Sequence, residues 1–277
     1  MKKYFLLTIV CGLLFACTNS PKTLVILHTN DTHSQIEPIS KGAKKNPGLG
    51  GAARRASIIN EERKKDKDLL LFDAGDFSQG TPYFNLFKGR AEIEIMNSMG
   101  YDAGTLGNHE FDNGVDTLVE ILKLAKFPIV CANYKVENTP LEGLVKKYVI
   151  LNKKGLKIGV FGLSPNPYSL ISPNQFAPVE YLDPYPIAQE IATMLKNKGC
   201  DLVICLSHLG FYPEGVGLPS DPELAQVTKD IDIIVGGHTH SLLLSGEKIA
   251  NLQGEEVLIG QTGKSGCYMG KMTIEFE

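Results

Sequence analysis

The chain has 277 residues, of which 43% are hydrophobic and 21% are charged. A hydrophobic fraction of this size is ordinary for a globular protein, so an extensively disordered chain is excluded. The formal net charge of −3 excludes the strongly basic surface that binding to duplex nucleic acid requires. The length allows one large domain or two small ones.

The first residues are predicted to be an export signal. Lys2 and Lys3 precede an apolar run over residues 4–16, which is too short to span a bilayer comfortably. The sequence Leu-Phe-Ala-Cys at 14–17 resembles the cleavage site of a bacterial lipoprotein, in which Cys17 carries the lipid and becomes the mature N-terminus. Two or more acyl chains on this cysteine would give stable membrane anchoring.

This pattern predicts the organisation of the mature protein. We expect a lipoprotein signal peptide over 1–16, a tether over 17–22 and a catalytic domain over 23–277. The protein would then be exported and lipid-anchored in the bacterial cell envelope, facing the periplasm. The alternative is ordinary cleavage near Ala16, which would release a freely soluble product.

Apolar runs and turn residues predict strands and helices that alternate along the chain. In chain order they are a strand over 24–27, a helix over 52–65, a strand over 69–72, helices over 83–99 and 115–126, strands over 129–131, 146–151 and 156–163, a helix over 187–198, a strand over 202–206, a helix over 221–228 and strands over 231–235, 256–260 and 267–276. Residues 164–186 are expected to form an irregular loop. The order indicates one α/β domain with a partly antiparallel sheet system.

Five of the six histidines lie in short polar segments that each follow an apolar, strand-like run. These segments are Asp31–His33, Gly107–Asp112, Ser207–His208 and Gly237–His240, and Gly75–Asp76 adds a carboxylate without a histidine. Imidazole, carboxylate and carboxamide groups form a ligand set that suits transition-type divalent metals. The sequence therefore predicts a metal centre at one edge of the sheet system.

The spacing within the segments suggests how the ligands are shared. Residues two apart in an extended segment point the same way, so Asp31 and His33 are expected to reach one cation together. By the same argument His238 and His240 would bind one cation or a neighbouring pair. Asp76, beside a glycine after a strand, could bridge two metals.

A second spacing indicates acid catalysis. Asp112 lies three residues after His109 in a predicted helical turn. This separation places a carboxylate where it can hold an imidazole. An oriented imidazole is the arrangement that general acid catalysis needs.

Taken together and in order, these segments resemble the calcineurin-like metallophosphoesterases, and within them the 5′-nucleotidase family of exported enzymes. The matching sequences are ILHTNDTH (26–33), GDFSQG (75–80), GNHEFD (107–112), SHLG (207–210) and GGHTH (236–240), with softer matches in GGAARR (50–55), FPIVCANY (127–134), IGVFGL (158–163) and LDPYPIAQE (182–190). The resemblance implies an α/β fold of the metallophosphoesterase type, a sandwich of two mixed β-sheets flanked by helices.

The resemblance also implies the roles of the site residues. Two divalent cations would be bound, the first by Asp31, His33, Asp76 and His240 and the second by Asp76, Asn108, His208 and His238. A hydroxide held between them would attack phosphorus in line. His109, oriented by Asp112, would stabilise the transition state and assist the leaving oxygen.

The expected substrates are nucleoside 5′-monophosphates, with 2′,3′-cyclic nucleotides and nucleotide sugars as further candidates. The metal stays open among Zn, Mn, Co, Fe and Mg, because ligands this mixed do not decide it. Histidine ligands must be neutral to bind a metal, so activity is expected to fall below about pH 6.

Other polar and aromatic residues have simpler interpretations. We expect His28 to be a buried, hydrogen-bonded structural histidine, Asp73 to stabilise a turn, Glu110 to support the ligands or to be exposed, Arg54 and Arg55 to lie on a helix surface, and Tyr168, Phe176, Phe211 and Tyr212 to pack rather than to stack on a nucleobase.

The resemblance covers only the metal-bearing half of the family, whose members usually continue into a domain that binds the nucleobase. Three explanations stay open: a separate chain carries the substrate-binding domain, the substrate is different, or the activity is broad and weak. A second hypothesis follows from the first explanation. The chain would be a catalytic half or docking lipoprotein that is inactive until a separate substrate-binding chain joins it.

Overall fold

The computed structural model describes residues 22–212, 215 and 217–276. The predicted signal peptide, the proposed lipid anchor on Cys17 and all but the last residue of the predicted tether lie outside this part of the chain. Within it, no helix combines the length and the apolar character needed to cross a membrane.

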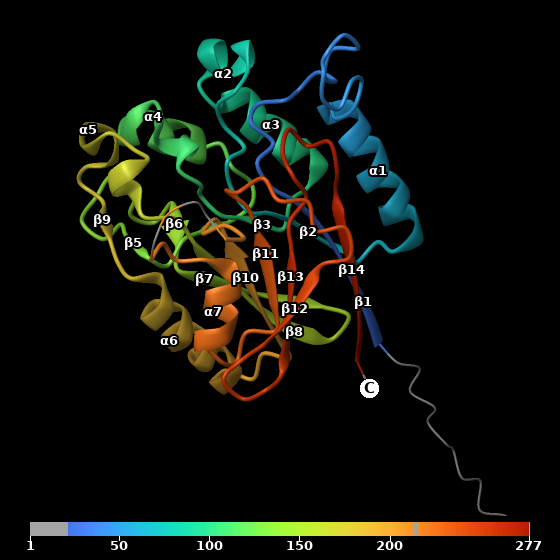
Figure 1. The fold of residues 1–277 in the computed structure, drawn as a ribbon, viewed down its shortest axis with the longest axis vertical. Helices are drawn as coiled ribbons and strands as arrows, with labels where there is room; N and C mark the ends of the chain where they lie inside the picture. The colour runs from blue at the N-terminus through green and yellow to red at the C-terminus, as the bar shows by residue number, and fades with distance from the viewer. Residues whose placement is uncertain (1–21, 213–214, 216, 277) are drawn as a thin grey trace, which may run out of the picture.

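The first of two six-stranded sheets contains the N-terminal strand and the C-terminal strand side by side (Figure 1). Its strands, in spatial order, are β14 (Gly270–Phe276), β1 (Lys22–Thr29), β2 (Leu70–Asp73), β3 (Ala103–Gly104), β4 (Ile129–Val130) and β6 (Val145–Lys146). β14 pairs antiparallel with β1, and the other neighbours pair in parallel. The sheet is therefore mixed.

The second six-stranded sheet is also mixed. Its strands, in spatial order, are β12 (Glu247–Ala250), β13 (Glu256–Gly260), β11 (Ile233–Gly236), β10 (Leu202–Ser207), β8 (Leu156–Leu163) and β7 (Tyr148–Lys153). The strands at the two edges, β12 and β7, pair antiparallel with their neighbours, while the four central strands are parallel. A short ribbon of β5 (Tyr134–Lys135) and β9 (Glu180–Tyr181) stands apart.

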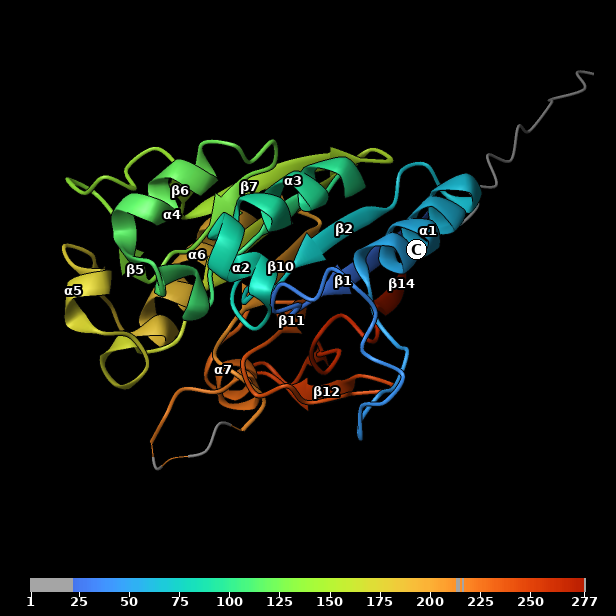
Figure 2. The same cartoon turned by 90° about the horizontal axis from the view of Figure 1, so that it is seen from above.

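Helices cover the outer faces of both sheets. They are α1 (Ala52–Lys65), α2 (Pro82–Phe87), α3 (Arg90–Met99), α4 (Gly114–Leu122), α5 (Pro173–Phe176), α6 (Pro184–Asn197) and α7 (Asp221–Val227), with short 3₁₀ turns η1 (His109–Phe111) and η2 (Pro167–Ser169). α1, α3 and α4 pack on the first sheet, whereas α6 and α7 pack on the second, so the two groups lie on opposite sides of the strands (Figures 1 and 2).

The alternation of side chains along the strands builds this layered core. In β1, Leu24 and Ile26 point into the apolar cluster between the sheets, while Leu27 points to the helices. In β10, Ile204 faces the same inner cluster and Cys205 faces α6. Each central strand is thus buried on both faces, as its continuous apolar run predicts. The predicted sandwich of two mixed sheets flanked by helices is confirmed.

The single helix predicted over 83–99 is wrong. The chain turns between α2 and α3, where Lys88 and Gly89 have φ values of 54° and 98°. A Cβ on Gly89 would lie 2.7 Å from Ile121 Cδ1, so close packing against α4 favours glycine there. Two short helices therefore replace one long one.

The predicted irregular loop over 164–186 is only partly irregular. It contains η2, α5 and β9, and α6 begins at Pro184 rather than at 187. Asp183 caps α6 by accepting a hydrogen bond from the backbone of Tyr185, and proline occupies the first helical position. The last predicted strand begins at Gly270, three residues later than expected.

Candidate metal centre

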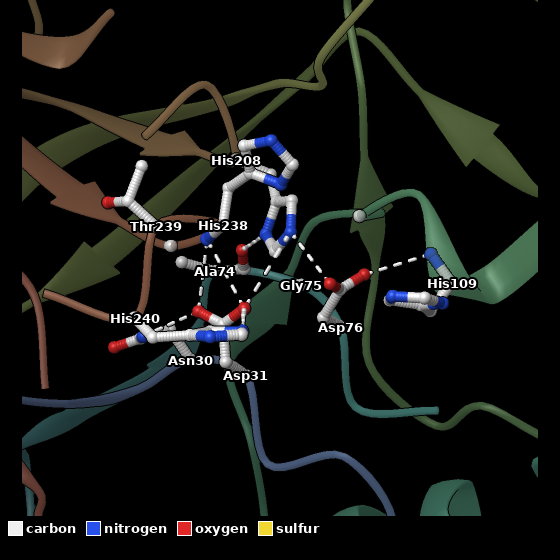
Figure 3. Close-up of polar contacts among 12 residues, drawn as sticks. Asn30, Asp31, Ala74, Gly75, Asp76, His109, His208, His238, Thr239 and His240 are labelled. Atoms are coloured by element: carbon white, nitrogen blue, oxygen red, sulfur yellow. Dashed lines mark hydrogen bonds and ion pairs between the residues drawn. The ribbon is translucent and has the colours of Figure 1, made fainter. Parts of the chain in front are cut away.

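The residues predicted as ligands lie at the edge where both sheets present the carboxyl ends of their parallel strands. Figure 3 labels Asp31, Asp76, His208, His238 and His240 among them. The predicted ligands follow β1 (Asp31, His33), β2 (Asp76), β3 (Asn108), β10 (His208) and β11 (His238, His240). Crevices at such strand ends are the usual location of sites in α/β proteins.

The loops that carry these residues are not extended. The prediction that Asp31 and His33, and likewise His238 and His240, point the same way because they lie two apart in extended segments is therefore wrong. Five of the residues have left-handed φ values: Asp31 at 48°, His33 at 47°, Asp76 at 52°, His238 at 71° and His240 at 54°. Such backbone is costly outside glycine and persists where surrounding structure enforces it, commonly at functional sites.

Backbone hydrogen bonds between the loops enforce this conformation. The backbone N–H of Asp31 donates to the carbonyl of Gly75 at 2.9 Å, and that of His33 donates to the carbonyl of Asp76 at 3.0 Å. The backbone N–H of His238 donates to the Asp31 carboxylate at 3.0 Å. The loops after β1, β2 and β11 are therefore fastened to one another.

Asp31, His33 and His240 form one cluster of donor atoms, all within 4.8 Å of one another. Asp31 Oδ1 lies 3.3 Å from His240 Nε2 and 3.7 Å from His33 Nε2. The two imidazole Nε2 atoms are 3.0 Å apart. His240 is about one-third exposed, so this cluster opens toward solvent.

Asp76, His208 and His238 form a second and more deeply buried cluster. His208 Nδ1 lies 2.6 Å from the carbonyl oxygen of Ala74, to which it can only donate. Nε2 therefore faces the centre, 3.1 Å from Asp76 Oδ2, and it offers a lone pair to a cation once the ring has lost its second proton. Fixing one ring nitrogen in this way is typical of metal-ligating histidines.

Asn108 lies in the chain between Gly107 and His109, both of which adjoin Asp76 of this cluster. The side chain of Asn108 is buried, yet its Oδ1 atom has no hydrogen-bond partner. An unsatisfied buried carbonyl oxygen is unfavourable unless another group, such as a cation, coordinates it. The residues present therefore fit divalent cations both in donor chemistry and in their unsatisfied atoms.

His109 and Asp112 form the predicted pair at one side of the clusters. His109 Nδ1 lies 2.8 Å from Asp112 Oδ2, and the backbone N–H of His109 donates to Asp76 Oδ1 at 2.9 Å. Burial lowers the pKa of His109, but the hydrogen bond with Asp112 and the charge of Asp76 outweigh it, so the pKa is raised. The spacing argument for this pair is confirmed in its geometry.

Burial and close charges shift the other ionisable groups in opposite directions. Burial lowers the pKa of His238 to about 4, with a further contribution from His208. Burial also lowers the pKa of His33. Burial opposes the charged forms of His208 and Asp76 as well, but their mutual attraction outweighs it, so the pKa of His208 is raised and that of Asp76 is lowered.

Glu110 supports the ligand loops of the first sheet. Of the two roles expected for it, supporting the ligands or lying exposed at the surface, the structure has the first. It is buried, and its carboxylate accepts hydrogen bonds from the backbone N–H groups of Gly107 (2.6 Å), Asp76 (3.0 Å) and Ser78 (3.0 Å). Burial and the charge of Asp76 raise its pKa to about 7. Glu110 thereby joins the loop after β2 to the loop after β3.

Gln261 supports the ligand loop of the second sheet and was missed from the sequence. Its buried amide donates to the carbonyl of Gly237 and accepts from the Thr239 hydroxyl and the backbone of Ser241. These contacts lie on both sides of His238. Gln261 directly follows a predicted strand, which is the same signal that located the ligands.

Asn30 was missed in the same way. Its Nδ2 donates to Asp31 Oδ2 at 2.6 Å and to the carbonyl of Gly263 at 2.9 Å, while its Oδ1 accepts from the backbone of Thr262 at 2.8 Å. It thereby connects the first sheet's carboxylate to the segment after β13.

The simpler interpretations are confirmed in part. Asp73 stabilises a turn by accepting from Thr29 Oγ1 and the backbone of Gly75. Arg54 is exposed as expected, but Arg55 is buried, with a hydrogen bond to the Gln35 carbonyl, so its predicted surface position is wrong.

His28 is buried as predicted, but its Nδ1 has no hydrogen-bond partner, so the expectation of a hydrogen-bonded histidine is wrong. Burial lowers its pKa to about 4. Phe176 packs against Phe111 as expected. Tyr168 and Tyr212 are 73% and 64% exposed, so they lie at the surface and, in the described part of the chain, each contacts only one ring, that of Tyr181 and that of Phe211.

An α/β sandwich with carboxylate, carboxamide and imidazole donors converging at one strand edge defines a metal-dependent phosphoesterase. Residues 24–242 match the family described as Calcineurin-like phosphoesterase. The chain belongs to this calcineurin-like phosphoesterase family, whose members use divalent metals.

Relatives named as nucleotidases share the fold over nearly all of the chain. A snake venom 5′-nucleotidase from Gloydius brevicauda is 36% identical over 274 residues, which cover 92% of this chain and 45% of the relative. The crystal structure of a 5′-nucleotidase precursor from Thermus thermophilus has a TM-score of 0.81 and 35% identity, covering 92% of this chain and 52% of that one. The structure of the NAD nucleotidase of Haemophilus influenzae has a TM-score of 0.81 and 30% identity, and the match covers 93% of this chain and 54% of that one. The chain thus spans about half the length of the curated relatives it matches.

Proposed function

We propose that this chain is a phosphohydrolase that holds two divalent cations and acts on nucleoside 5′-monophosphates. Asp31, His33, Asp76 and His240 would bind one cation, and Asp76, Asn108, His208 and His238 would bind the other. The observation that carries the proposal is the position of Asp76 Oδ2, 3.1 Å from His208 Nε2 and 4.0 Å from His33 Nε2. This carboxylate oxygen adjoins both donor clusters, and Asp31 Oδ1, 3.9 Å from His208 Nε2, approaches the second cluster from the first.

Bound cations would lower the pKa of a water molecule and neutralise charge that develops on the phosphate. The chain's own acid is His109, whose Nδ1 is held by Asp112, which leaves Nε2 for the reacting group. Its raised pKa increases the fraction of protonated imidazole that can donate a proton to the leaving oxygen. Asp112 orients this imidazole.

The proposed substrate follows from the relatives that are named 5′-nucleotidases. The name of the NAD nucleotidase supports including dinucleotides and nucleotide sugars in a substrate screen, together with 2′,3′-cyclic nucleotides. We also propose that the signal over 1–16 exports the protein and that a lipid on Cys17 anchors it in the cell envelope. Conversion of Cys17 to serine should move the protein from the membrane fraction to the soluble fraction.

Phosphate release from AMP tests the activity. Protein stripped with a chelator should be inactive, and readdition of Mn²⁺, Co²⁺, Zn²⁺, Fe²⁺ or Mg²⁺ one at a time should restore turnover and identify the preferred ion. No turnover of any phosphate ester with any of these ions would contradict the proposal. Neither the site nor the comparisons support the alternative of a docking lipoprotein, which predicts turnover only after a second chain is added.

A further inference from the structure

A cavity of about 430 Å³ adjoins the second donor cluster at His238. Three loops that follow strands of the second sheet line it, through Pro165, Asn166, Ser169 and Leu170 after β8, Leu209, Phe211, Tyr212, Leu218 and Pro219 after β10, and His238, Thr239 and Ser241 after β11. Small-molecule sites have volumes of roughly 300–1,000 Å³. The cavity is therefore large enough for the organic part of an ester whose phosphate lies at the cluster.

Exposed apolar side chains gather at this cavity. Leu170, Tyr212 and Leu218 are 41%, 64% and 37% exposed. The rings of Phe211 and Tyr212 lie edge to face, with centroids 4.9 Å apart. Apolar surface gathered at one place on a soluble protein is typical of a binding site. The exposed ring of Tyr212 leaves a face on which a flat ring can stack.

The polar groups that line the cavity in the described part of the chain come from asparagine, serine, threonine, tyrosine and histidine side chains. Among the lining residues that the structure describes, none is lysine, arginine, aspartate or glutamate. Enclosing a charged group without a partner is costly, so this lining favours a neutral ligand. Asn166 and Ser169 supply hydrogen-bonding groups that can orient it.

We propose that this cavity binds the flat, uncharged organic group of the substrate, so that the metallophosphoesterase domain itself distinguishes nucleoside monophosphates from simpler phosphate esters. The inference rests on the proposed phosphohydrolase function and adds a location for the nucleobase. Tyr212 is the specificity-determining residue, because its ring is the most exposed apolar surface at the cavity.

Paired substrates test the specificity. AMP and ribose 5-phosphate carry the same phosphoryl ester, and only AMP carries a nucleobase. Tyr212→Ala should lower kcat/KM for AMP roughly 5- to 100-fold, the range expected for loss of one stacking contact, and should leave ribose 5-phosphate unchanged. Ser169→Phe, which fills the cavity, should have the same selective effect. Phe87→Ala removes an exposed ring that does not line the cavity and should change neither substrate.

Binding of adenosine provides a measurement that does not depend on turnover. Adenosine has no phosphate, so it should bind the chelator-treated protein and Phe87→Ala in a calorimetric titration, and it should bind Tyr212→Ala and Ser169→Phe much more weakly. Equal binding to all four proteins, or an unchanged ratio of AMP to ribose 5-phosphate activity, would overturn the inference. Absence of turnover with both esters would instead refute the proposed function, while the adenosine titration would still decide whether the cavity binds a nucleoside.

Discussion

The two sheets contribute different chemistry to the edge at which they meet. The first sheet supplies both carboxylates, the carboxamide and the imidazole of His33, from the loops after β1, β2 and β3, whereas the second supplies imidazoles alone, from the loops after β10 and β11. Each sheet also has its own supporting side chain, the acidic Glu110 in the first and the neutral Gln261 in the second. The negative charge that attracts cations is thus concentrated in one sheet, and the other adds neutral donors.

This division predicts different consequences for substitutions in the two sheets. Changes in the first sheet should remove charge and affect both cations, because Asp76 adjoins both clusters. Changes in the second sheet should act on individual ligands and on their protonation. Four experiments test this comparison, beginning with the largest expected effect.

Substitution of the shared carboxylate should be the most damaging change. Asp76→Asn keeps the shape of the side chain but removes the charge next to both clusters, so activity should fall by more than the roughly 10- to 100-fold typical of losing a supporting residue. Metal content after dialysis, measured by mass spectrometry, should drop for both sites. Asp31→Asn serves as the comparison and should reduce occupancy of one site more than the other. Full occupancy in Asp76→Asn would refute the shared site.

Loss of the acid should impair turnover without loss of metal. His109→Asn should lower kcat by about 10²- to 10⁴-fold, the usual contribution of a general acid. Cation affinity should stay close to that of the unmodified protein, since His109 is assigned to proton transfer. Asp112→Asn should have a smaller effect, because the imidazole remains and only its orientation and raised pKa are lost. A parallel loss of metal would assign His109 to the ligands instead.

The two supporting residues should have effects of intermediate size in different places. Glu110→Gln and Gln261→Ala should each weaken metal binding by about 10- to 100-fold. Because Glu110 holds the loops after β2 and β3, its loss should affect both sites, whereas loss of Gln261 should affect the ligands after β11. Visible absorption during Co²⁺ titration reports each site. Gln189→Ala removes a half-buried glutamine on α6 and serves as the matched control; if it weakened binding equally, the supporting roles would be excluded.

The smallest expected effect is a dependence of metal affinity on pH. It is caused by His208, a proposed ligand of the second sheet. The charge of Asp76 outweighs burial and raises the pKa of His208, so this ring carries a proton at neutral pH when no cation is present. A cation must displace that proton, and affinity should therefore rise about tenfold per pH unit for one proton released. Activity should correspondingly decline as the pH falls through neutrality, whereas His33 and His238, whose pKa values burial lowers, should stay neutral until the solution is more acidic. Calorimetry in buffers of different ionisation enthalpy measures the released proton, and its absence at about pH 7.5, well above the free histidine pKa, would contradict this origin.

Apolar runs marked most of the strands as buried on both faces, and the family resemblance supplied their arrangement in two sheets. The short strand β3 (Ala103–Gly104), which precedes Asn108, was not predicted. The left-handed backbone of Asp31, His33 and His238 could not be predicted from apolar runs. It depends on hydrogen bonds to loops that are distant in sequence, such as the bond from the Asp31 backbone to Gly75.

The break between α2 and α3 escaped prediction for a similar reason. Lys88 and Gly89 lie within a pattern that predicts one amphipathic helix, but both have left-handed φ values, and Gly89 lies close to Ile121 of a helix distant in sequence. Gln261 was missed because a lone glutamine carries no metal-ligand signal. Only its position after a strand distinguishes it, and its role depends on contacts with Gly237 and Ser241.

The hydrogen bonds that tie the loop after β1 to the loop after β2 run from backbone to backbone. These bonds between peptide groups hold the two loops together whichever ion the site contains. We therefore expect withdrawal of the metal to be a reversible exchange rather than an unfolding event. Where the concentrations of metal ions vary, such a protein can release one ion and bind another without unfolding.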